Sequence, residues 1–164
     1  MSLYICSLKR ATEQSIPPDT YVLLRFPFGS AESMDKHGMH QMAQPDGFDI
    51  ASWDSDPRSG LIWPKVAGWA TITGMIYWRG GSATKFVDRV IRDPLGFTTT
   101  HPMDTTATEY RHPFDGASPY HKTHQMAVEP GVPLGLQVRH NGDSDQAVYL
   151  AEFKVAIDTD VAEA

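Results

Sequence analysis

Histidine is the residue type in this sequence that is best suited to bind a metal ion. Of the seven histidines, His37 and His40 lie in one polar stretch, and His121 and His124 are three residues apart. Imidazole is a common side-chain ligand of transition metals, so two such pairs that converged on one ion would hold zinc or nickel. A metal-dependent hydrolase, the enzymatic alternative, would require these four histidines to converge. Their spacing in the sequence does not show that the two pairs lie close together in space. We therefore predict loop or interface histidines and no metal site. The remaining histidines are scattered: His101, His112 and His140.

Two short acidic runs have a spacing that can supply oxygen ligands to calcium. They are Asp54-Ser55-Asp56 and Asp143-Ser144-Asp145. Neither run continues into the glycine and glutamate positions of a calcium-binding loop. Asp and Ser also favour turns, because their short side chains bond to the neighbouring backbone. We expect both runs to form turns.

No residue pattern marks an activated nucleophile. Nucleophilic catalysis needs a Ser or Cys beside a base. Cys6 lies in a predicted strand, and Gly29-Ser30 and Gly81-Ser82 lack the glycine-serine-glycine elbow of hydrolases. The sequence also lacks a glycine-rich phosphate loop. We therefore predict that the protein is not an enzyme and has no catalytic residues and no cofactor.

The four tryptophans, Trp53, Trp63, Trp69 and Trp78, offer flat apolar faces on which a sugar ring could stack. Such stacking would make the protein a carbohydrate- or receptor-binding module. Cores and subunit interfaces are the commoner places for tryptophan. We predict that Trp78 lies in the core and that Trp69, together with Tyr77, lies at a subunit interface.

Composition excludes several classes of protein. The chain has 164 residues, 41% of them hydrophobic and 21% charged, which is typical of an ordinary globular domain. The net charge of −6 argues against nucleic acid or an anionic membrane as the main partner. A single cysteine allows no internal disulfide and suits a reducing cytosol. The first residues lack the pattern of a signal peptide, and no apolar stretch has the length of a membrane span.

Short β-prone runs separated by turns dominate the sequence, which contains 13 glycines and 12 prolines. Residues 82–92 are the best helical candidate, but Asp93-Pro94 ends them and charged residues interrupt them, so we predict a strand. The stretch 93–125 is predicted to be irregular, with room for a few short strands. This pattern predicts one all-β domain, 1–164, with an antiparallel sandwich, jelly-roll or barrel fold. The other predicted strands are 3–9, 20–26, 48–53, 61–65, 68–78, 133–140 and 147–157.

The run from Gly68 to Trp78 is apolar on both faces of the predicted strand. An antiparallel sheet with one wet face alternates apolar and polar residues, so a strand without a polar face must be covered on both sides. In a helix-poor protein, a second copy of the chain is a plausible cover. The face predicted to meet neighbouring copies carries Trp69, Thr71, Thr73, Met75 and Tyr77, and the core face carries Ala70, Ile72, Gly74, Ile76 and Trp78. In the last strand, one face is predicted to carry Tyr149, Ala151, Phe153, Val155 and Ile157.

The order of several short motifs resembles the small jelly-roll proteins of tailed bacteriophages that share the topology of complement globular heads and tumour necrosis factors. In chain order, these motifs are Gln14-Ser15-Ile16, the Asp35 loop with Gly38-Met39-His40, Trp63-Pro64, Gly68-Trp69 and the strand end Tyr77-Trp78. The sequence departs from the pattern by a longer insert at 52–61 and by a proline- and histidine-rich stretch after Phe97.

The resemblance implies a TNF-like antiparallel jelly roll of about ten strands that assembles as a homotrimer and has no catalytic site. It further implies a structural protein of a bacteriophage virion, either a capsid decoration or a minor tail or tail-tip protein, made in the host cytoplasm. The expected partners are other copies of the chain and the major capsid or tail proteins. A carbohydrate- or receptor-binding adhesin with the same fold, directed at a host surface glycan, is the alternative.

Overall fold

The computed structural model describes residues 2–29, 34–98 and 104–160, and these form antiparallel strands with one short 3-10 helix. No helix among these residues is long and apolar enough to cross a membrane. The elements are β1 (Leu3–Arg10), β2 (Gln14–Ile16), β3 (Val22–Leu23), η2 (Pro57–Gly60), β4 (Gly68–Trp78), β5 (Phe86–Arg92), β6 (Asp104–Arg111), β7 (Ser118–Val128), β8 (Leu134–His140) and β9 (Gln146–Asp158).

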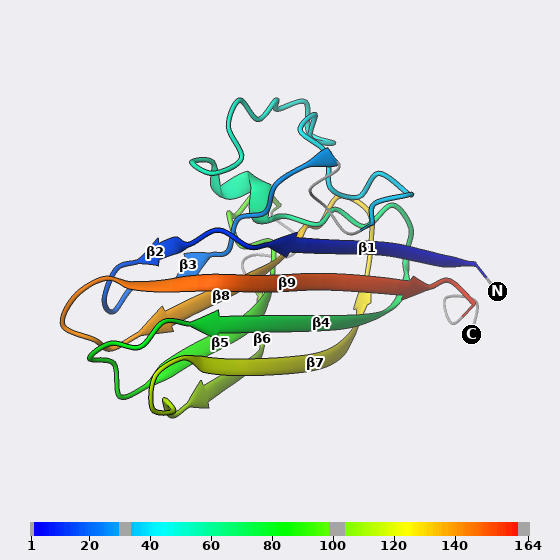
Figure 1. Ribbon diagram of the computed structural model, residues 1–164. Helices are drawn as coiled ribbons and strands as arrows, with labels where there is room; N and C mark the ends of the chain where they lie inside the picture. The colour runs from blue at the N-terminus through cyan, green and yellow to red at the C-terminus, as the bar shows by residue number, and fades with distance from the viewer. Residues whose placement is uncertain (1, 30–33, 99–103, 161–164) are drawn as a thin grey trace.

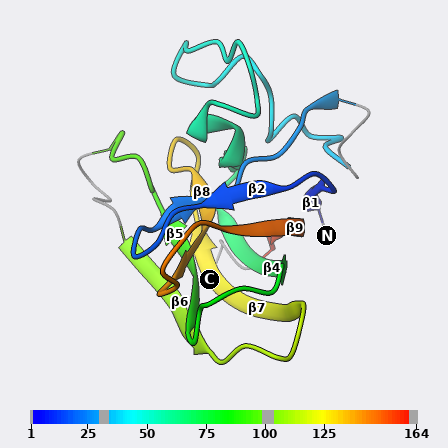
Figure 2. The same cartoon turned by 60° about the vertical axis from the view of Figure 1, so that its left-hand side comes forward.

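Two antiparallel sheets face each other, and the chain crosses repeatedly between them (Figures 1 and 2). Sheet A has the order β1-β9-β4-β7, with β2 also paired to β9, and sheet B has the order β3-β8-β5-β6. The side chains that alternate inward from both sheets form one apolar core, which includes Leu8, Ile72, Trp78, Leu136 and Phe153. The predicted strand over 82–92 is confirmed as β5, and the predicted first and last strands match β1 and β9.

A bulge in sheet A corrects one prediction about the last strand. The pairing of β4 with β9 shifts between Tyr77, which lies opposite Leu150, and Trp78, which lies opposite Val148. An extra residue on one strand reverses the side of the sheet to which the residues beyond it point. The prediction that Tyr149 shares a face with Ala151 is therefore wrong: Tyr149 contacts Tyr77, with 5.9 Å between the ring centroids.

The stretch 93–125, which was predicted to be irregular, contains β6 and most of β7. Lys122 points inward from β7, which breaks the expected alternation, and its ammonium lies 2.8 Å from the buried carboxylate of Asp88 on β5. The same ammonium is bonded to the carbonyl of Ala107, whose φ of 49° marks an irregularity in β6. Arg111 also bonds to Asp88, at 2.8 Å. This ionic cluster joins the two sheets on their β6–β7 side.

The long connection between β3 and β4 is irregular and lies above β1 in the view of Figure 1. The carboxylate of Asp35 accepts the backbone N–H groups of Met39 and His40 and fixes the first turn. The predicted strands 48–53 and 61–65 are wrong: these segments contribute only single bridges, Ala43 with Asp49 and Ile62 with Leu134. Glycine, proline and aspartate punctuate this region, so the backbone turns before a strand can extend.

The outer face of sheet B is covered by this connection and by the segment that follows β5. Leu23, Leu61 and Trp63 form a second apolar cluster there, against which Leu95 packs. The indole N–H of Trp63 donates a 2.7 Å hydrogen bond to Gln44, so its polar group is satisfied on burial. Sheet B therefore has an apolar layer on each of its two faces.

Candidate self-association surface

The five residues predicted to face neighbouring copies lie on the outer face of sheet A. They alternate along β4 with residues that point into the core. Trp69 is 41% exposed, and the other four are partly buried. Figure 1 views this face directly, with β1, β9, β4 and β7 in front, and no other ribbon of the described chain crosses it. The residues are Trp69, Thr71, Thr73, Met75 and Tyr77.

A glycine on the core side of β4 lets the two sheets approach closely at this point. A Cβ added to Gly74 would lie 3.2 Å from a methyl carbon of Leu136 on sheet B. That distance is tighter than ordinary van der Waals contact, so a larger residue would require the Leu136 side chain to shift by a few tenths of an ångström. Gly74 therefore allows β4, whose outer face carries Thr73 and Met75, to pack closely on sheet B.

The strand register extends the apolar surface beyond β4. Trp69 lies opposite Asp158 of β9, and Asp158 lies opposite Leu3 of β1. One step further along the sheet, Ile5, Ala156 and Thr71 align in the same way. Leu3 is 45% exposed. The prediction did not include the residues of β1, although Leu3 and Ile5 already occupy alternate positions of the first predicted strand.

At the other end of the face, aromatic rings and a cation form a small cluster. Tyr77 meets the rings of Tyr149 and His121 edge-on. The guanidinium of Arg79 lies 4.3 Å from the centroid of the Tyr149 ring and forms a 2.7 Å ion pair with Glu13. The bulge in β9 is therefore the reason that Tyr149 belongs to this surface.

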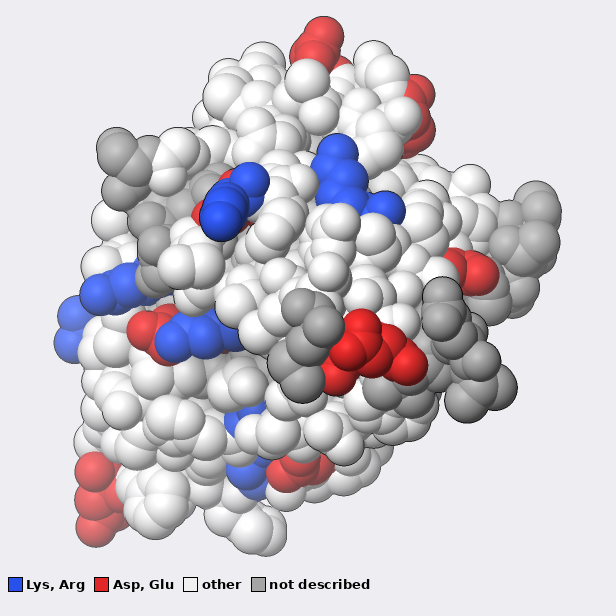
Figure 3. All heavy atoms as spheres, turned by 90° about the vertical axis from the view of Figure 1, so that its right-hand side faces the viewer, with Lys and Arg blue, Asp and Glu red and all other residues white. Residues whose placement is uncertain are grey.

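The charged side chains of β1 and β9 on this face are Lys9, Glu152, Lys154 and Asp158. Lys154 and Glu152 form a 2.9 Å ion pair on β9, and Glu152 lies opposite Lys9 on β1. Figure 3 shows the end of the molecule near the termini, where acidic and basic side chains are scattered among uncharged ones. The core of a protein interface is depleted in charged residues, and on this face the strand β4 carries none.

The described residues do not bring the two histidine pairs together. His40 is fully buried, and its Nε2 lies 2.7 Å from the carbonyl of Ser59, whereas His37 contacts the ring of Tyr4. His121 and His124 point to opposite faces of β7. Within the described ranges, no group of three or more His, Cys, Asp or Glu side chains is placed to hold a metal ion. His101 lies outside the described residues.

The other residues considered as nucleophiles or calcium ligands lie in the core or in turns. Cys6 is buried in the core. Asp56 caps η2 by accepting the N–H of Arg58, which confirms a turn role. Asp143 accepts a bond from the hydroxyl of Ser82, and this bond holds the pKa of Asp143 below its ordinary value. Both acidic runs thus lie in turns, as predicted.

One buried residue that the sequence reasoning missed is Arg10. Its side chain is fully buried and donates to the carbonyls of Thr12, Glu13 and Arg25 and to the side chain of Gln14. Burial lowers the pKa of Arg10, and the nearby carboxylate of Asp54 partly offsets this effect. A basic residue at the end of an alternating strand was the only signal in the sequence.

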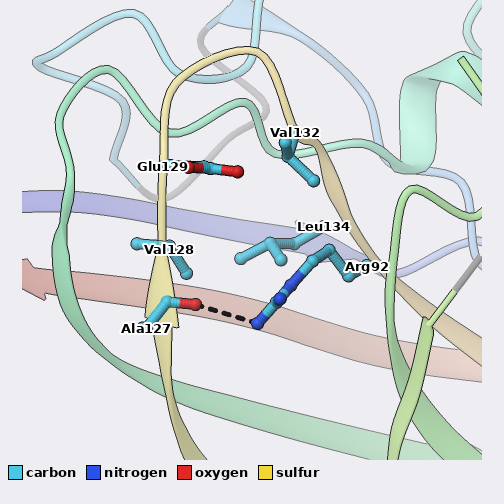
Figure 4. Close-up of a pocket in the computed structure, with 6 residues that line it drawn as sticks. All are labelled: Arg92, Ala127, Val128, Glu129, Val132 and Leu134. Atoms are coloured by element: carbon cyan, nitrogen blue, oxygen red, sulfur yellow. Dashed lines mark hydrogen bonds between the residues drawn. The ribbon is translucent and has the colours of Figure 1, made fainter. Parts of the chain in front are cut away.

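A small pocket lies between β5 and the turn that joins β7 to β8 (Figure 4). Its volume is about 120 Å³, and Arg92 on its wall donates a 3.0 Å bond to the carbonyl of Ala127. Ligand pockets typically have roughly 300–1,000 Å³, so we assign this one no function. The lining residues are Arg92, Ala127, Val128, Glu129, Val132 and Leu134.

No protein-family model and no curated protein sequence matches the chain significantly, whereas its structure resembles many solved ones. Murine APRIL aligns with a TM-score of 0.62 at 6% identity, covering 96% of this chain and 100% of that one. The fold is a jelly roll of the TNF and C1q type. The globular domain of zebrafish complement 1qA aligns with this jelly roll at 0.60 and 11% identity, covering 93% and 94% of the two chains. Eiger TNF from S. frugiperda aligns at 0.58 and 12% identity, covering 99% and 96%. At these identities the likeness shows the fold alone.

Proposed function

We propose that this jelly roll is a non-enzymatic structural protein that assembles as a homotrimer through the outer face of sheet A. The observation that carries the proposal is the exposure of Trp69 and Leu3, at 41% and 45%, on a sheet face that no described segment covers. Leu3 and Trp69 flank Asp158 on this face, and exposed apolar residues that gather on one face among polar ones mark an interaction site in soluble proteins. The central strand β4 supplies an unbroken row of apolar and threonine side chains for that contact.

Burial of this face would supply the cohesion of the assembly. A standard interface buries roughly 800 Å² per partner, and apolar surface contributes about 25 cal/mol per Å². In a closed three-fold arrangement every copy buries the same surface, because each subunit presents the same residues to its two neighbours. The ion pair between Lys154 and Glu152 leaves little net charge on β9 to oppose the contact.

The proposed setting is a bacteriophage virion, in which the trimer decorates the capsid or forms part of the tail tip. The support is the order of the motifs around Gln14-Ser15-Ile16, Gly38-Met39-His40 and Gly68-Trp69, which resembles small jelly-roll proteins of tailed phages. The partners would be copies of the chain and the major capsid or tail proteins. An adhesin of the same fold differs only in whether its loops bind a ligand.

The test of self-association is the solution mass of the purified chain, measured by light scattering after size exclusion. We expect three times the mass of one chain, and we expect Trp69→Glu to give a monomer, because a buried carboxylate without a partner opposes the contact. Tyr110→Glu, at a side chain that is 66% exposed on β6, is the matched control and should leave the mass unchanged. Far-UV circular dichroism checks that each variant folds. A wild-type monomer at all concentrations would contradict the proposal.

A further inference from the structure

Trp53 has a different environment from the other three tryptophans. Trp63 and Trp78 are buried, and Trp69 lies on the outer face of sheet A. Trp53 is half-buried and lines an open cleft of about 460 Å³ between the end of β1 and the irregular connection that follows β3. We infer that this cleft binds the pyranose ring of a neutral sugar, with Trp53 as the stacking platform. The lining residues are Lys9, Arg10, Ala11, Thr12, Pro27 and Trp53.

The indole of Trp53 is held in place before any ligand arrives. The guanidinium of Arg10 lies 5.1 Å from the centroid of its ring, in cation–π contact. Arg10 itself cannot move freely, because its donors are bonded to backbone carbonyls at 2.8–2.9 Å, including that of Thr12. The backbone carbonyl of Trp53 accepts a 2.6 Å bond from the hydroxyl of Ser59. A platform fixed in this way loses little conformational entropy on binding.

The chemistry around the cleft matches a molecule with one apolar face and hydroxyl groups at its edge. The rings of Trp53 and Pro27 supply flat apolar surface. Lys9 supplies an exposed ammonium donor, and the carboxylate of Asp54, which is 62% exposed, supplies an acceptor beside Arg10. Ligand sites typically combine an apolar lining with a few polar groups that fix orientation. A pyranose ring has this combination, with C–H groups on its face and hydroxyls at its rim.

The charge balance of the cleft favours a neutral ligand. The N–H groups of Arg10 already donate hydrogen bonds within the protein, so Arg10 is not placed to form a bidentate pair with a carboxylate or phosphate. The charge of Asp54 offsets that of Arg10, and Lys9, the other basic residue of the lining, lies opposite Glu152 on β9. The volume of the cleft falls within the roughly 300–1,000 Å³ of typical ligand sites.

The cleft is separate from the proposed trimer surface. It lies beyond the end of β1 and borders the outer face of sheet A only at Lys9, whereas the five interface residues lie on β4, two strands away. Its wall includes Trp53, which belongs to the insert at 52–61 by which the sequence departs from the phage pattern. Sugar binding and self-association are therefore expected to fail independently.

The test is saturation-transfer difference NMR on the full chain, with methyl glycosides of glucose, galactose and mannose and with N-acetylglucosamine as probes. We expect saturable binding of at least one probe, and we expect Trp53→Ala to weaken it by about tenfold or more, as for a buried aromatic anchor. Trp53→Phe, which retains a ring, should keep part of the affinity. Tyr110→Ala, at an exposed aromatic residue on β6, is the matched control and should bind as the wild type does.

Two further measurements separate this inference from the proposed function. The solution mass of Trp53→Ala should equal that of the wild type, and Trp69→Glu should still bind the probe as a monomer. The inference is overturned if no probe binds saturably to the wild type, or if Trp53→Ala folds and binds as tightly as the control. Because Trp53→Ala could unfold the connection, Asp54→Ala, which lies away from sheet A, provides a second variant, with an expected loss of about threefold to tenfold for one charged hydrogen bond.

Discussion

The outer face of sheet B is covered by the chain's own loops, whereas the outer face of sheet A is open across its centre. On sheet B, Val87 and Ile91 point outward from β5 and are 2% and 0% exposed. On sheet A, Leu3 and Trp69 point outward and are 45% and 41% exposed. Both sheets contain strands with two apolar faces, which require a cover on each side. The cover of sheet B is intramolecular. The outer face of sheet A has no such cover among the described residues, and this is the reason to expect a partner.

The comparison also separates two kinds of stability. The cluster of Leu23, Leu61 and Trp63 contributes to each chain regardless of protein concentration. A cover supplied by another copy stabilises only the assembled state and grows with concentration by mass action. The two faces therefore respond differently to substitution and to dilution, and each response is measurable.

The largest effect on the single chain is expected from Leu61→Ala. Leu61 is fully buried over sheet B, and truncating a buried leucine typically costs about 2–5 kcal/mol through lost burial and a cavity. Urea unfolding should show this loss at every protein concentration, with the solution mass unchanged at low denaturant. A loss that appears only in dilute samples would mean that this cover, too, belongs to the assembly.

The next largest effect is expected from Trp69→Ala, and it should fall on assembly. Truncating a tryptophan that becomes buried in an interface commonly costs about 2 kcal/mol or more of binding free energy. The dissociation constant from sedimentation equilibrium should therefore rise by more than tenfold. Thermal unfolding of the dissociated chain should change little, because Trp69 is already 41% exposed there. An equal loss of stability in the dissociated chain would assign Trp69 to the fold instead.

A smaller effect is expected from Arg89→Ala on the covered sheet. The guanidinium of Arg89 lies 3.5 Å from the centroid of the Tyr21 ring and donates to Gln137 at 2.9 Å. Cation–π contacts of this kind contribute about 0.5–1 kcal/mol, so urea unfolding should show a loss of this order. Arg89→Lys, which keeps the charge but not the planar group, should recover part of it. No change in either variant would show that the contact contributes nothing to the cover.

The smallest effect is expected away from both faces, at Ser82→Ala. The hydroxyl of Ser82 lowers the pKa of Asp143, and Ser144 contributes in the same direction. A carboxyl with a lowered pKa stabilises the fold above the unfolded value of about 3.9. That stabilisation is lost as the pH falls through the folded pKa. The stability gap between wild type and Ser82→Ala should therefore narrow in acid, as measured by urea unfolding from pH 7 to pH 3. A gap that does not narrow would contradict this account of Asp143.

Regular alternation explains which parts of the fold were predictable from the sequence. The strands β1, β4, β8 and β9 carry apolar residues at every second position, and their ranges were predicted within a residue or two. The strand β7 was missed because Lys122 points inward to meet Asp88 across the sandwich. A charge at an inward position hides the alternation, and its partner is known only once the sheets are paired.

The candidate surface was predictable only in part, for similar reasons. The two apolar faces of β4 were visible in the residues from Trp69 to Tyr77. The contribution of Tyr149 depends on a bulge. A bulge reverses the side of the sheet to which the following side chains point, and the amino-acid sequence does not reveal it. The cleft at Trp53 depends on Arg10, 43 positions earlier, and no local pattern reports such a contact. Whether the surface binds another copy stays a prediction.

Hydroxyl-radical footprinting tests the central claim most directly, because it measures the solvent access of individual side chains in the assembled protein. Met42, on the connection above β1, is 46% exposed in the single chain and provides an internal reference for Leu3 and Trp69. We predict that Leu3 and Trp69 are protected in concentrated samples and lose this protection on dilution, while Met42 reacts at the same rate throughout. Equal reactivity of Trp69 at all concentrations would contradict the claim that other copies cover sheet A.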